Sequence, residues 1–427
     1  MCFWVSTMSS RGFYGWRMVY GCMAIGTISW GLGLFGASAF LHAIHQKAGL
    51  SIAQISSAIT ATYLTAAFTQ IWVGSAINRY GPRLVISFGA AVFAIGVAGL
   101  GFVDTIGQAY AAFFAMGVGW ACLSTTALTT TLSPWFELYQ GKAASTAMLG
   151  ASIGGMIGVP MLMLGFTHLG LTATAVTAAL FSLIVITTIA ALILRHRPSD
   201  MGLHPDGIER THESTYIPPK HWGRTEALRT KTLRTLMLGF GIGLLVQLGF
   251  ITHHVALLLP TLGAAGASST VAGTALTAFV GRIALARYAD RVDVRLTAFV
   301  LMVVGAVCLA TMALFPNAWV LVIVSLLYGL TIGNVTTLSP VIVRREFGAI
   351  SFGVVYGTAA AGIQVMNSLG PTVYGALYDA FGSYSAPLLL AAVLKAIAGT
   401  IILYGGRYRQ RELSPDNVGI GAQTKAC

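Results

Sequence analysis

Long apolar runs separated by short polar turns occupy most of this chain. A helix that crosses a membrane needs about 20 predominantly apolar residues. Twelve runs of suitable length lie near residues 17–44, 52–77, 83–103, 107–132, 143–168, 171–194, 233–259, 267–289, 296–315, 317–343, 352–378 and 384–405. The pattern therefore predicts an all-α integral membrane protein with twelve transmembrane helices.

One long polar segment, residues 195–231, divides these runs into two sets of six. It contains prolines and side chains of both charges, which is typical of a linker. We expect an N-terminal six-helix bundle at 1–194, a cytoplasmic linker at 195–231, a C-terminal six-helix bundle at 232–410 and a cytoplasmic tail at 411–427.

Composition and charge support a membrane protein and indicate its orientation. Of 427 residues, 56% are hydrophobic and 9% are charged, whereas a soluble domain carries about 25% charged residues. The net charge of +12 comes from Lys and Arg at one alternating set of helix ends, apart from Lys47, Arg282 and Lys395. Basic residues favour the cytoplasmic side, so this asymmetry predicts that both termini are cytoplasmic. Because the membrane orientation accounts for the charge, we expect no nucleic-acid partner.

The two sets of runs share an internal repeat. Segment 74–83, GSAINRYGPR, resembles segment 286–295, ARYADRVDVR, at an offset of 212 residues. The same offset pairs His42 with His254, Gln70 with Arg282, Asn78 with Asp290, Arg79 with Arg291, Arg83 with Arg295 and Gly158 with Gly370. The sequence TTLSP also occurs twice, at 130–134 and 336–340. Parallel halves related by an axis along the membrane normal are an architecture of secondary transporters.

Segment 74–83 also resembles the G-x-x-x-D-R-x-G-x-R signature of the major facilitator superfamily, with Asn78 in the place of the family's Asp. The resemblance extends over about 15–407 and implies two pseudo-symmetric six-helix bundles, the major facilitator fold. It further implies a gating role for the residues of the two basic turns, namely Asn78, Arg79, Arg83, Asp290 and Arg291.

Three further segments resemble the bacterial monocarboxylate and oxalate–formate branch of that superfamily. They are GWRMV at 15–19, PWFELYQGKA at 134–143 and RPSDMGLHPDG at 197–207. This resemblance implies a multi-pass protein of the bacterial inner membrane.

Arg282 is the main candidate for substrate binding. It lies inside an apolar run, where a charged side chain costs roughly 2.5–3.5 kcal/mol and usually faces a wet cavity or a partner. The monocarboxylate branch has an Arg in this region that binds the substrate carboxylate, and a guanidinium can pair with a carboxylate through two hydrogen bonds. The alternative is that Arg282 extends along its helix toward the cytoplasmic surface.

Histidines are the candidates for proton coupling, because all thirteen Asp and Glu lie in loops or at helix ends. His42 and His45 lie in the outer part of helix 1, and His253 and His254 lie in the matching part of helix 7. We expect all four to face one outer vestibule, where histidine titrates near neutral pH; structural histidines are the alternative. A proton carried by the substrate, a histidine relay and anion exchange all stay open. No acid or thiol lies near these histidines in sequence, so we expect no metal site and no cofactor.

Further polar and aromatic residues are candidates for the lining of the cavity. Besides Arg282, His42 and His254, the substrate-binding candidates are the amides Gln70, Asn334, Gln364 and Asn367, with Tyr63 and Trp120 as apolar walls. Gln247 is another amide within a run, although intramembrane amides also join helices to one another. We expect Lys395, in the last run, to be peripheral or to extend along its helix toward the membrane surface.

Together these features predict a secondary active transporter for a small organic anion, a monocarboxylate being the first choice, that works by alternating access with proton symport. The alternative is an exchanger or exporter for another organic anion or an amphipathic compound. A membrane-embedded enzyme that uses the histidines is a distant alternative, because no span offers the acid that would orient them. We expect partners to be the anion, protons and lipids, and the functional unit to be a monomer.

Overall fold

The structure is a computed structural model that describes residues 13–137, 139–207, 222–288, 293–347 and 352–405. Among these residues the regular secondary structure is helical, and no strand is present. The elements between residues 14 and 192 are α1 (Tyr14–Trp30), η1 (Gly31–Phe35), α2 (Gly36–Ala48), α3 (Ile52–Tyr80), α4 (Pro82–Leu100), α5 (Ile106–Leu123), α6 (Thr125–Leu132), η2 (Ser133–Trp135), α7 (Gln140–His168) and α8 (Gly170–Leu192).

The second part of the chain repeats this pattern after a connecting region. The connecting region contains η3 (Pro198–Met201), η4 (Pro205–Gly207) and α9 (Arg224–Arg229). The following helices are α10 (Lys231–Tyr288), α11 (Val294–Leu314), α12 (Ala318–Phe347), α13 (Phe352–Ser368), α14 (Gly370–Phe381) and α15 (Ser385–Tyr404). We refer to α1–α8 as the N-group and to α10–α15 as the C-group.

Helix α10 crosses the membrane twice. Its 58 residues would extend about 87 Å as a single helix, against about 30 Å for the apolar core of a bilayer. The helix breaks at Gly263, which has φ 65° and ψ 179° and follows Pro260. A side chain at this φ would be strained, so glycine permits the reversal. The two predicted runs at 233–259 and 267–289 are therefore the two arms of α10.

All twelve predicted runs correspond to helices. In the described part of the chain, nine helices are long and apolar enough to cross a membrane, with α10 counted once. The second arm of α10, the more polar α3, and α13 together with α14 supply the other crossings. The protein is thus a multi-pass membrane protein.

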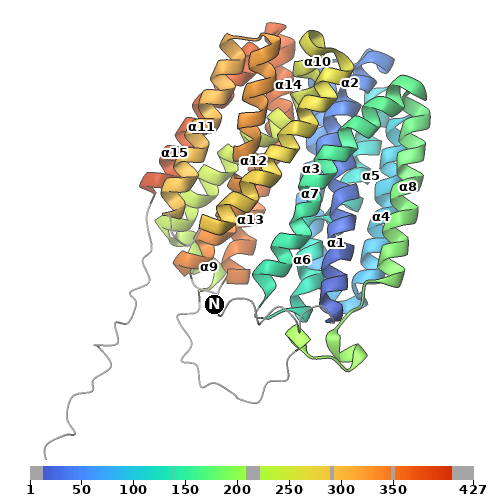
Figure 1. Cartoon of the computed structure of the whole chain (residues 1–427), viewed down its shortest axis with the longest axis vertical. Coiled ribbons are helices and arrows are strands. Elements are labelled where there is room, and N and C mark those ends of the chain that lie inside the picture. The colour runs from blue at the N-terminus through green and yellow to red at the C-terminus, as the bar shows by residue number, and fades with distance from the viewer. Residues whose placement is uncertain (1–12, 138, 208–221, 289–292, 348–351, 406–427) are drawn as a thin grey trace, which may run out of the picture.

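The two groups of helices stand side by side (Figure 1). The N-terminal end of α1, the C-terminal ends of α8 and α15 and the connecting region lie at one end, which we call the linker end. The loop between α2 and α3 and the turn between the two arms of α10 lie at the opposite end, which we call the far end. Each half of the chain therefore begins and ends at the linker end.

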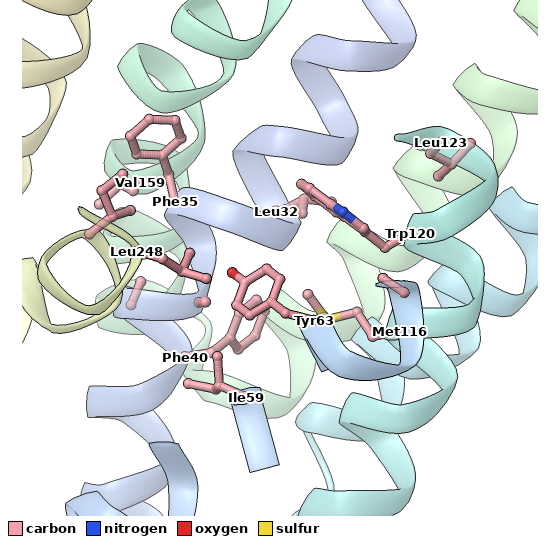
Figure 2. Close-up of a cluster of buried hydrophobic side chains, with 14 of the residues drawn as sticks. Leu32, Phe35, Phe40, Ile59, Tyr63, Met116, Trp120, Leu123, Val159 and Leu248 are labelled. Carbon is pink, nitrogen blue, oxygen red and sulfur yellow. The ribbon is translucent and has the colours of Figure 1, made fainter. Parts of the chain in front are cut away.

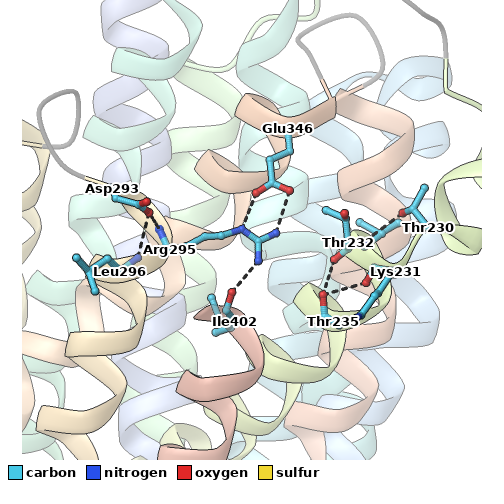
Figure 3. A network of polar contacts seen from close by, with 10 residues as sticks. Thr230, Lys231, Thr232, Thr235, Asp293, Arg295, Leu296, Glu346 and Ile402 are labelled. Carbon is cyan, nitrogen blue, oxygen red and sulfur yellow. Dashed lines mark hydrogen bonds and ion pairs between the residues drawn. The ribbon is translucent and has the colours of Figure 1, made fainter. Parts of the chain in front are cut away.

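The sequence repeat is visible in equivalent hydrogen bonds. Arg83 donates from Nε to the carbonyl oxygen of Leu194, after the end of α8, at 2.7 Å. Arg295, its partner in the repeat, donates from Nη1 to the carbonyl oxygen of Ile402, near the end of α15, at 2.6 Å (Figure 3). In the N-group α4 is thus fastened to the end of α8, and in the C-group α11 is fastened to α15. In both cases the arginine of the basic turn makes the contact.

Arg295 also forms an ion pair inside the C-group. Its Nε and Nη2 atoms donate to the two carboxylate oxygens of Glu346, at 2.6 and 2.9 Å. The side chain of Arg295 is 2% exposed and that of Glu346 is 13% exposed. Asp293 completes the arrangement by accepting hydrogen bonds from the backbone of Arg295 and Leu296 at the start of α11 (Figure 3). This network lies at the linker end and joins α11, α12 and α15.

Candidate functional site

Arg282 lies where the two groups meet. It is half-buried on the second arm of α10. Its Nε donates to the carbonyl oxygen of Gly333 on α12 at 3.2 Å, and its Nη1 donates to the carbonyl oxygen of Met148 on α7 at 3.1 Å. The guanidinium thus joins the C-group to the N-group and does not extend into lipid.

The depth of the Arg282 head group follows from the direction of its helix. Side chains on a helix lean toward its N-terminus, and the second arm of α10 runs from the far end to the linker end. Arg282 therefore leans away from the linker end, and it meets α12 at Gly333, the middle of a helix that runs from Ala318 to Phe347. Its position near mid-helix argues against extension to the cytoplasmic surface.

Arg282 keeps hydrogen-bonding capacity and charge for a further partner. A guanidinium has five N–H donors, and the two described hydrogen bonds end on neutral carbonyl oxygens. A glycine at 333 is needed for this approach, since a Cβ there would lie 2.7 Å from the Cγ and 2.8 Å from the Nε of Arg282. The charge of Arg282 is therefore available to an anion.

Amide side chains lie on the helices around Arg282. Asn334 follows Gly333 on α12 and donates to the carbonyl oxygen of Leu330 at 2.9 Å. Gln247, on the first arm of α10, donates to the carbonyl oxygen of Ile332 at 3.3 Å. The Oδ1 of Asn334 and the Oε1 of Gln247 are buried without a donor among the described residues. Buried amide oxygens are usually hydrogen-bonded, so both are suited to accept from a polar guest.

The other predicted amides have different surroundings. Gln70, the repeat partner of Arg282, is half-buried on α3 and accepts from the hydroxyl of Thr126 at 2.8 Å. Gln364 and Asn367 are half-buried on α13, and the Oδ1 of Asn367 has no donor among the described residues. Gln70 thus contacts α6 through a side-chain hydroxyl, whereas its repeat partner Arg282 contacts α12 through a backbone carbonyl oxygen.

Tyr63 and Trp120 are core residues, contrary to the expectation that they form cavity walls. They are 2% and 6% exposed. The hydroxyl of Tyr63 donates to the carbonyl oxygen of Gly33 at 3.2 Å, and the two rings pack edge to face at 6.5 Å. Figure 2 shows both rings in a cluster that also includes Leu248 of α10. Their apolar surface is used in helix packing, so the sequence pattern could not separate a wall from a core.

The four histidines do not share one vestibule in this structure. His42 is half-buried, and the Nδ1 of His45 pairs with the carbonyl oxygen of Leu50 at 2.7 Å in the turn after α2. His253 and His254 are 1% and 3% exposed. His254 lies within the C-group, with its Nε2 at 3.0 Å from the hydroxyl of Ser325. Consecutive residues on a helix point in different directions, which explains why His253 and His254 separate.

His253 belongs to a closed contact between the groups at the far end. Its Nε2 lies 3.1 Å from the hydroxyl of Ser56 on α3 and 3.1 Å from the carbonyl oxygen of Pro371, and its Nδ1 lies 3.1 Å from the hydroxyl of Tyr384. Asp379 accepts from the backbone N–H of Ala53 at 3.1 Å, at the N-terminus of α3. Such a position favours a carboxylate because the first N–H groups of a helix are free.

Gly375 sets how closely α14 and α3 approach at the far end. A Cβ at this position would lie 2.6 Å from the Oγ of Ser56 and 3.0 Å from the Cα of Ala53. Replacement of Gly375 by leucine is expected to hold the far end open, because the added side chain cannot fit between the helices. In a variant without the native cysteines, a cysteine at Thr60, which is 5% exposed here, should then react faster with a membrane-impermeant maleimide.

The matched control for this prediction is Gly107→Leu, since nothing lies within 4 Å of a Cβ at Gly107. Equal labelling rates in the Gly375 and Gly107 variants would contradict the role assigned to Gly375.

Comparison with known proteins identifies the family. The family model of the Major Facilitator Superfamily matches residues 21–351 and 255–425. This chain belongs to the major facilitator superfamily. It is therefore a membrane transporter for small molecules, and its family is not one of enzymes.

Two curated relatives of this major facilitator are distant. One is the "Oxalate:formate antiporter" of Oxalobacter formigenes, 24% identical over 235 residues, which are 55% of this chain and 54% of the relative. The other is the "Agnestins efflux protein AgnL12" of Paecilomyces divaricatus, 24% identical over 338 residues, or 77% of this chain and 72% of the relative. The first match thus spans about half the length of the curated relative.

Solved structures share the fold. A bacterial homologue of the human lysosomal transporter Spinster, in an inward-facing and occupied conformation, has a TM-score of 0.69 at 15% identity over 91% of this chain and 96% of the other. A point mutant of the nucleoside transporter NupG has a TM-score of 0.70 at 12% identity over 91% and 99% of the two chains. At these identities the likeness establishes the major facilitator fold.

The gating residues implied by the family signature are only partly described. Asn78 and Arg79 are exposed at the linker end, and the guanidinium of Arg79 lies 5.2 Å from the ring centre of Tyr80. Arg83 fastens α8 as described above, a structural role that its position in the signature did not reveal. Asp290 and Arg291 lie outside the described residues.

The prediction that Lys395 is peripheral is wrong. Lys395 is fully buried in this major facilitator, where it donates to the hydroxyl of Tyr328 at 2.6 Å. Its run offers no periodic polar face that would signal an inward-pointing lysine. The small residues opposite it, such as Gly305, make its burial possible and are visible only in the structure.

Proposed function

We propose that this major facilitator carries a small organic anion, a monocarboxylate being the first choice, and that Arg282 binds the carboxylate. The observation that carries the proposal is a half-buried guanidinium at the junction of the two groups whose described hydrogen bonds both end on neutral carbonyl oxygens. An anion would balance this charge at a depth where water is scarce. Asn334, Gln364, Asn367 and Gln70 supply polar groups for the remainder of the substrate.

The transport cycle in this proposal is alternating access between two rigid bundles, 1–194 and 232–410, joined by the linker at 195–231. The far-end contacts of His253 and Asp379 correspond to the state that is closed at that end. To reach the opposite state, these hydrogen bonds must break together with the bond from Arg282 to Met148. Binding of an anion to Arg282 would weaken that bond and favour the change of state.

Proton symport is the first choice for the driving reaction, because it neutralises the charge of the anion that is carried. Anion exchange is the second candidate, since the relative from Oxalobacter formigenes is named an antiporter. Counterflow in liposomes separates them, because an obligatory exchanger requires an anion on both sides whereas a symporter accumulates substrate with a proton gradient alone.

The remaining parts of the proposal concern the cellular setting. The basic residues concentrated at the linker end favour its placement in the cytoplasm, together with both termini. We assign the protein to a bacterial inner membrane and to a functional monomer. Labelling of single cysteines near Ser75 and near Gly107 in intact cells tests this orientation, since only the latter should be accessible from outside.

Thermal stability measured with a panel of carboxylates tests the substrate class. Any ligand that binds the native state raises its apparent stability, by about 2.7 kcal/mol at a concentration 100 times Kd. We expect one or more of formate, acetate, lactate and oxalate to raise the melting temperature of the purified protein, and the matched amides to have no effect. A panel in which uncharged analogues stabilise as well as the acids would contradict an anion site.

A further inference from the structure

Lys395 occupies the interior of the C-group at the middle of its helix. It is the eleventh of 20 residues in α15 and has no exposed surface. Its Nζ donates to the hydroxyl of Tyr328 at 2.6 Å and lies 4.1 Å from the centre of the same ring. Gly305 on α11 leaves room for it, since a Cβ there would lie 3.0 Å from Nζ.

No carboxylate balances this amine in the described part of the C-group. The acids there are at helix ends: Asp293 and Glu346 are at the linker end, and Asp379 is at the far end. The titratable groups beside the amine are its partner Tyr328 on α12 and Cys308 on α11, and Tyr374 on α14 lies beside Tyr328. None of them is an acid that is charged at neutral pH. A buried ammonium without a counter-charge costs several kcal/mol, so the neutral amine avoids a large penalty.

The hydrogen bond between Lys395 and Tyr328 suits both protonation states of the amine. An ammonium donates to the phenol oxygen, and a neutral amine accepts from the phenol O–H, so the pair needs no rearrangement when the proton is exchanged. The geometry is therefore that of a site able to hold and release a proton.

Helix α12 connects this pair to Arg282. Tyr328 and Gly333 lie on one helix, and Gly333 accepts from Arg282. Gly329 and Gly333 bring α12 against the second arm of α10, where a Cβ would lie 2.4 Å and 2.5 Å from the backbone oxygens of Thr274 and Ala278. Because these helices touch through their backbones, a shift of Tyr328 is transmitted to the helix that carries Arg282.

A chain of aromatic rings extends from the same tyrosine toward the predicted proton-coupling residues. Tyr328 packs on Phe250 with ring centres 4.6 Å apart, and Phe250 packs on His254 at 4.5 Å. The hydrogen bond between His254 and Ser325 returns to α12 one turn before Tyr328. His254 and Lys395 thus both contact the part of α12 that carries Ser325 and Tyr328.

We propose that Lys395, with Tyr328 as its hydrogen-bond partner, is the proton-binding site of this transporter. The inference rests on the proposed anion symport, in which the charged amine and the anion at Arg282 stabilise each other. Such coupling is reciprocal: the proton raises the affinity for the anion by the factor by which the anion raises the affinity for the proton. The histidines then serve packing and closure of the far end.

Transport by Lys395→Met in liposomes tests the proposal. Methionine keeps the length of the side chain and removes the proton site. With labelled formate or oxalate as the probe, we expect accumulation driven by an inward proton gradient to fall by about 5- to 150-fold, the usual range of coupling between two sites. Counterflow without a gradient, measured at an anion concentration that saturates the variant, should stay close to that of the wild type, because exchange requires no net movement of the proton.

Lys47→Met is the matched control, since Lys47 is a partly exposed lysine at the far end that pairs with Asp104 at 3.1 Å. It should retain both activities. Gradient-driven accumulation by Lys395→Met at the wild-type level would overturn the proposal, and so would an equal loss of counterflow and accumulation, which would indicate a structural role.

A second measurement does not depend on the substrate. If Lys395 exchanges a proton, the melting temperature of the wild type should fall relative to Lys395→Met as the pH is lowered from about 9 and should then level off, because the slope ends once the folded protein has bound the proton that the unfolded chain already carries. Parallel curves would mean that the amine stays charged, and a difference that keeps growing down to about pH 5 would mean that it stays neutral; either result would overturn an exchangeable proton at Lys395. If the wild type carries none of the carboxylates, the transport proposal fails, and this pH dependence alone decides whether Lys395 binds a proton.

Discussion

Replacement of Arg282 by glutamine is expected to lower carboxylate transport, measured as kcat/KM in liposomes, by about 100-fold. Hydrogen bonds to charged groups contribute about 1.5–3 kcal/mol, and 1.4 kcal/mol corresponds to a factor of ten. Glutamine can still donate to one of the two carbonyl oxygens that Arg282 contacts, on Gly333 and Met148. The variant therefore removes mainly the charge and leaves most of the packing.

Arg282→Lys separates charge from geometry. Lysine restores the charge but has no planar fork, so it cannot form the paired hydrogen bonds that a guanidinium makes with a carboxylate. We expect it to recover part of the lost activity, to within about tenfold of the wild type. Arg344→Gln, which removes an exposed arginine of α12, is the control and should transport normally. Wild-type uptake by Arg282→Gln at normal expression would exclude Arg282 from the substrate site.

The number of spans and their order could be predicted from the sequence because both depend on local composition. Apolar length predicts a span, and the offset of 212 residues between Arg83 and Arg295 predicts that the halves share a fold. The structure shows what the two arginines do: Arg83 and Arg295 each donate to a carbonyl oxygen near the end of the last helix of their group, α8 and α15. The sequence repeat thus predicted that the two arginines occupy equivalent positions, but it did not predict the contacts that they make.

The direction in which each side chain points could not be predicted in the same way. In a helix that is apolar all round, no hydrophobic face distinguishes lipid from protein. The sequence therefore favours Trp120 and Tyr63 as cavity walls, whereas both are core residues, and it favours a peripheral Lys395, which is central.

Contacts between segments that are far apart along the chain also could not be predicted from the sequence. His253 meets Ser56 and Asp379 meets Ala53 across the two groups, and neither pair shares a motif. Their positions depend on how the two groups pack against each other at the far end. Glu346 is a similar case, because its place near a helix end does not reveal the buried arginine with which the structure pairs it.

Replacement of Glu346 by glutamine is expected to destabilise the protein by about 3–5 kcal/mol, the usual cost of breaking a buried ion pair from one side. Arg295 would keep its bond to the carbonyl oxygen of Ile402 but lose the carboxylate of Glu346 while 2% exposed. The free energy of unfolding can be measured by denaturant titration in detergent micelles. Asp104→Asn offers a direct comparison, because it breaks the exposed pair with Lys47 and should cost at most about 1 kcal/mol.

The double variant Arg295→Met/Glu346→Gln shows whether the loss comes from the unpaired charge. Once both charges are removed, no buried ion is left without a partner, so the double variant should be more stable than Glu346→Gln alone. A double variant whose destabilisation equals the sum of the two single changes would mean that the two residues act independently. The ion pair would then not be what fastens α11, α12 and α15 together at the linker end.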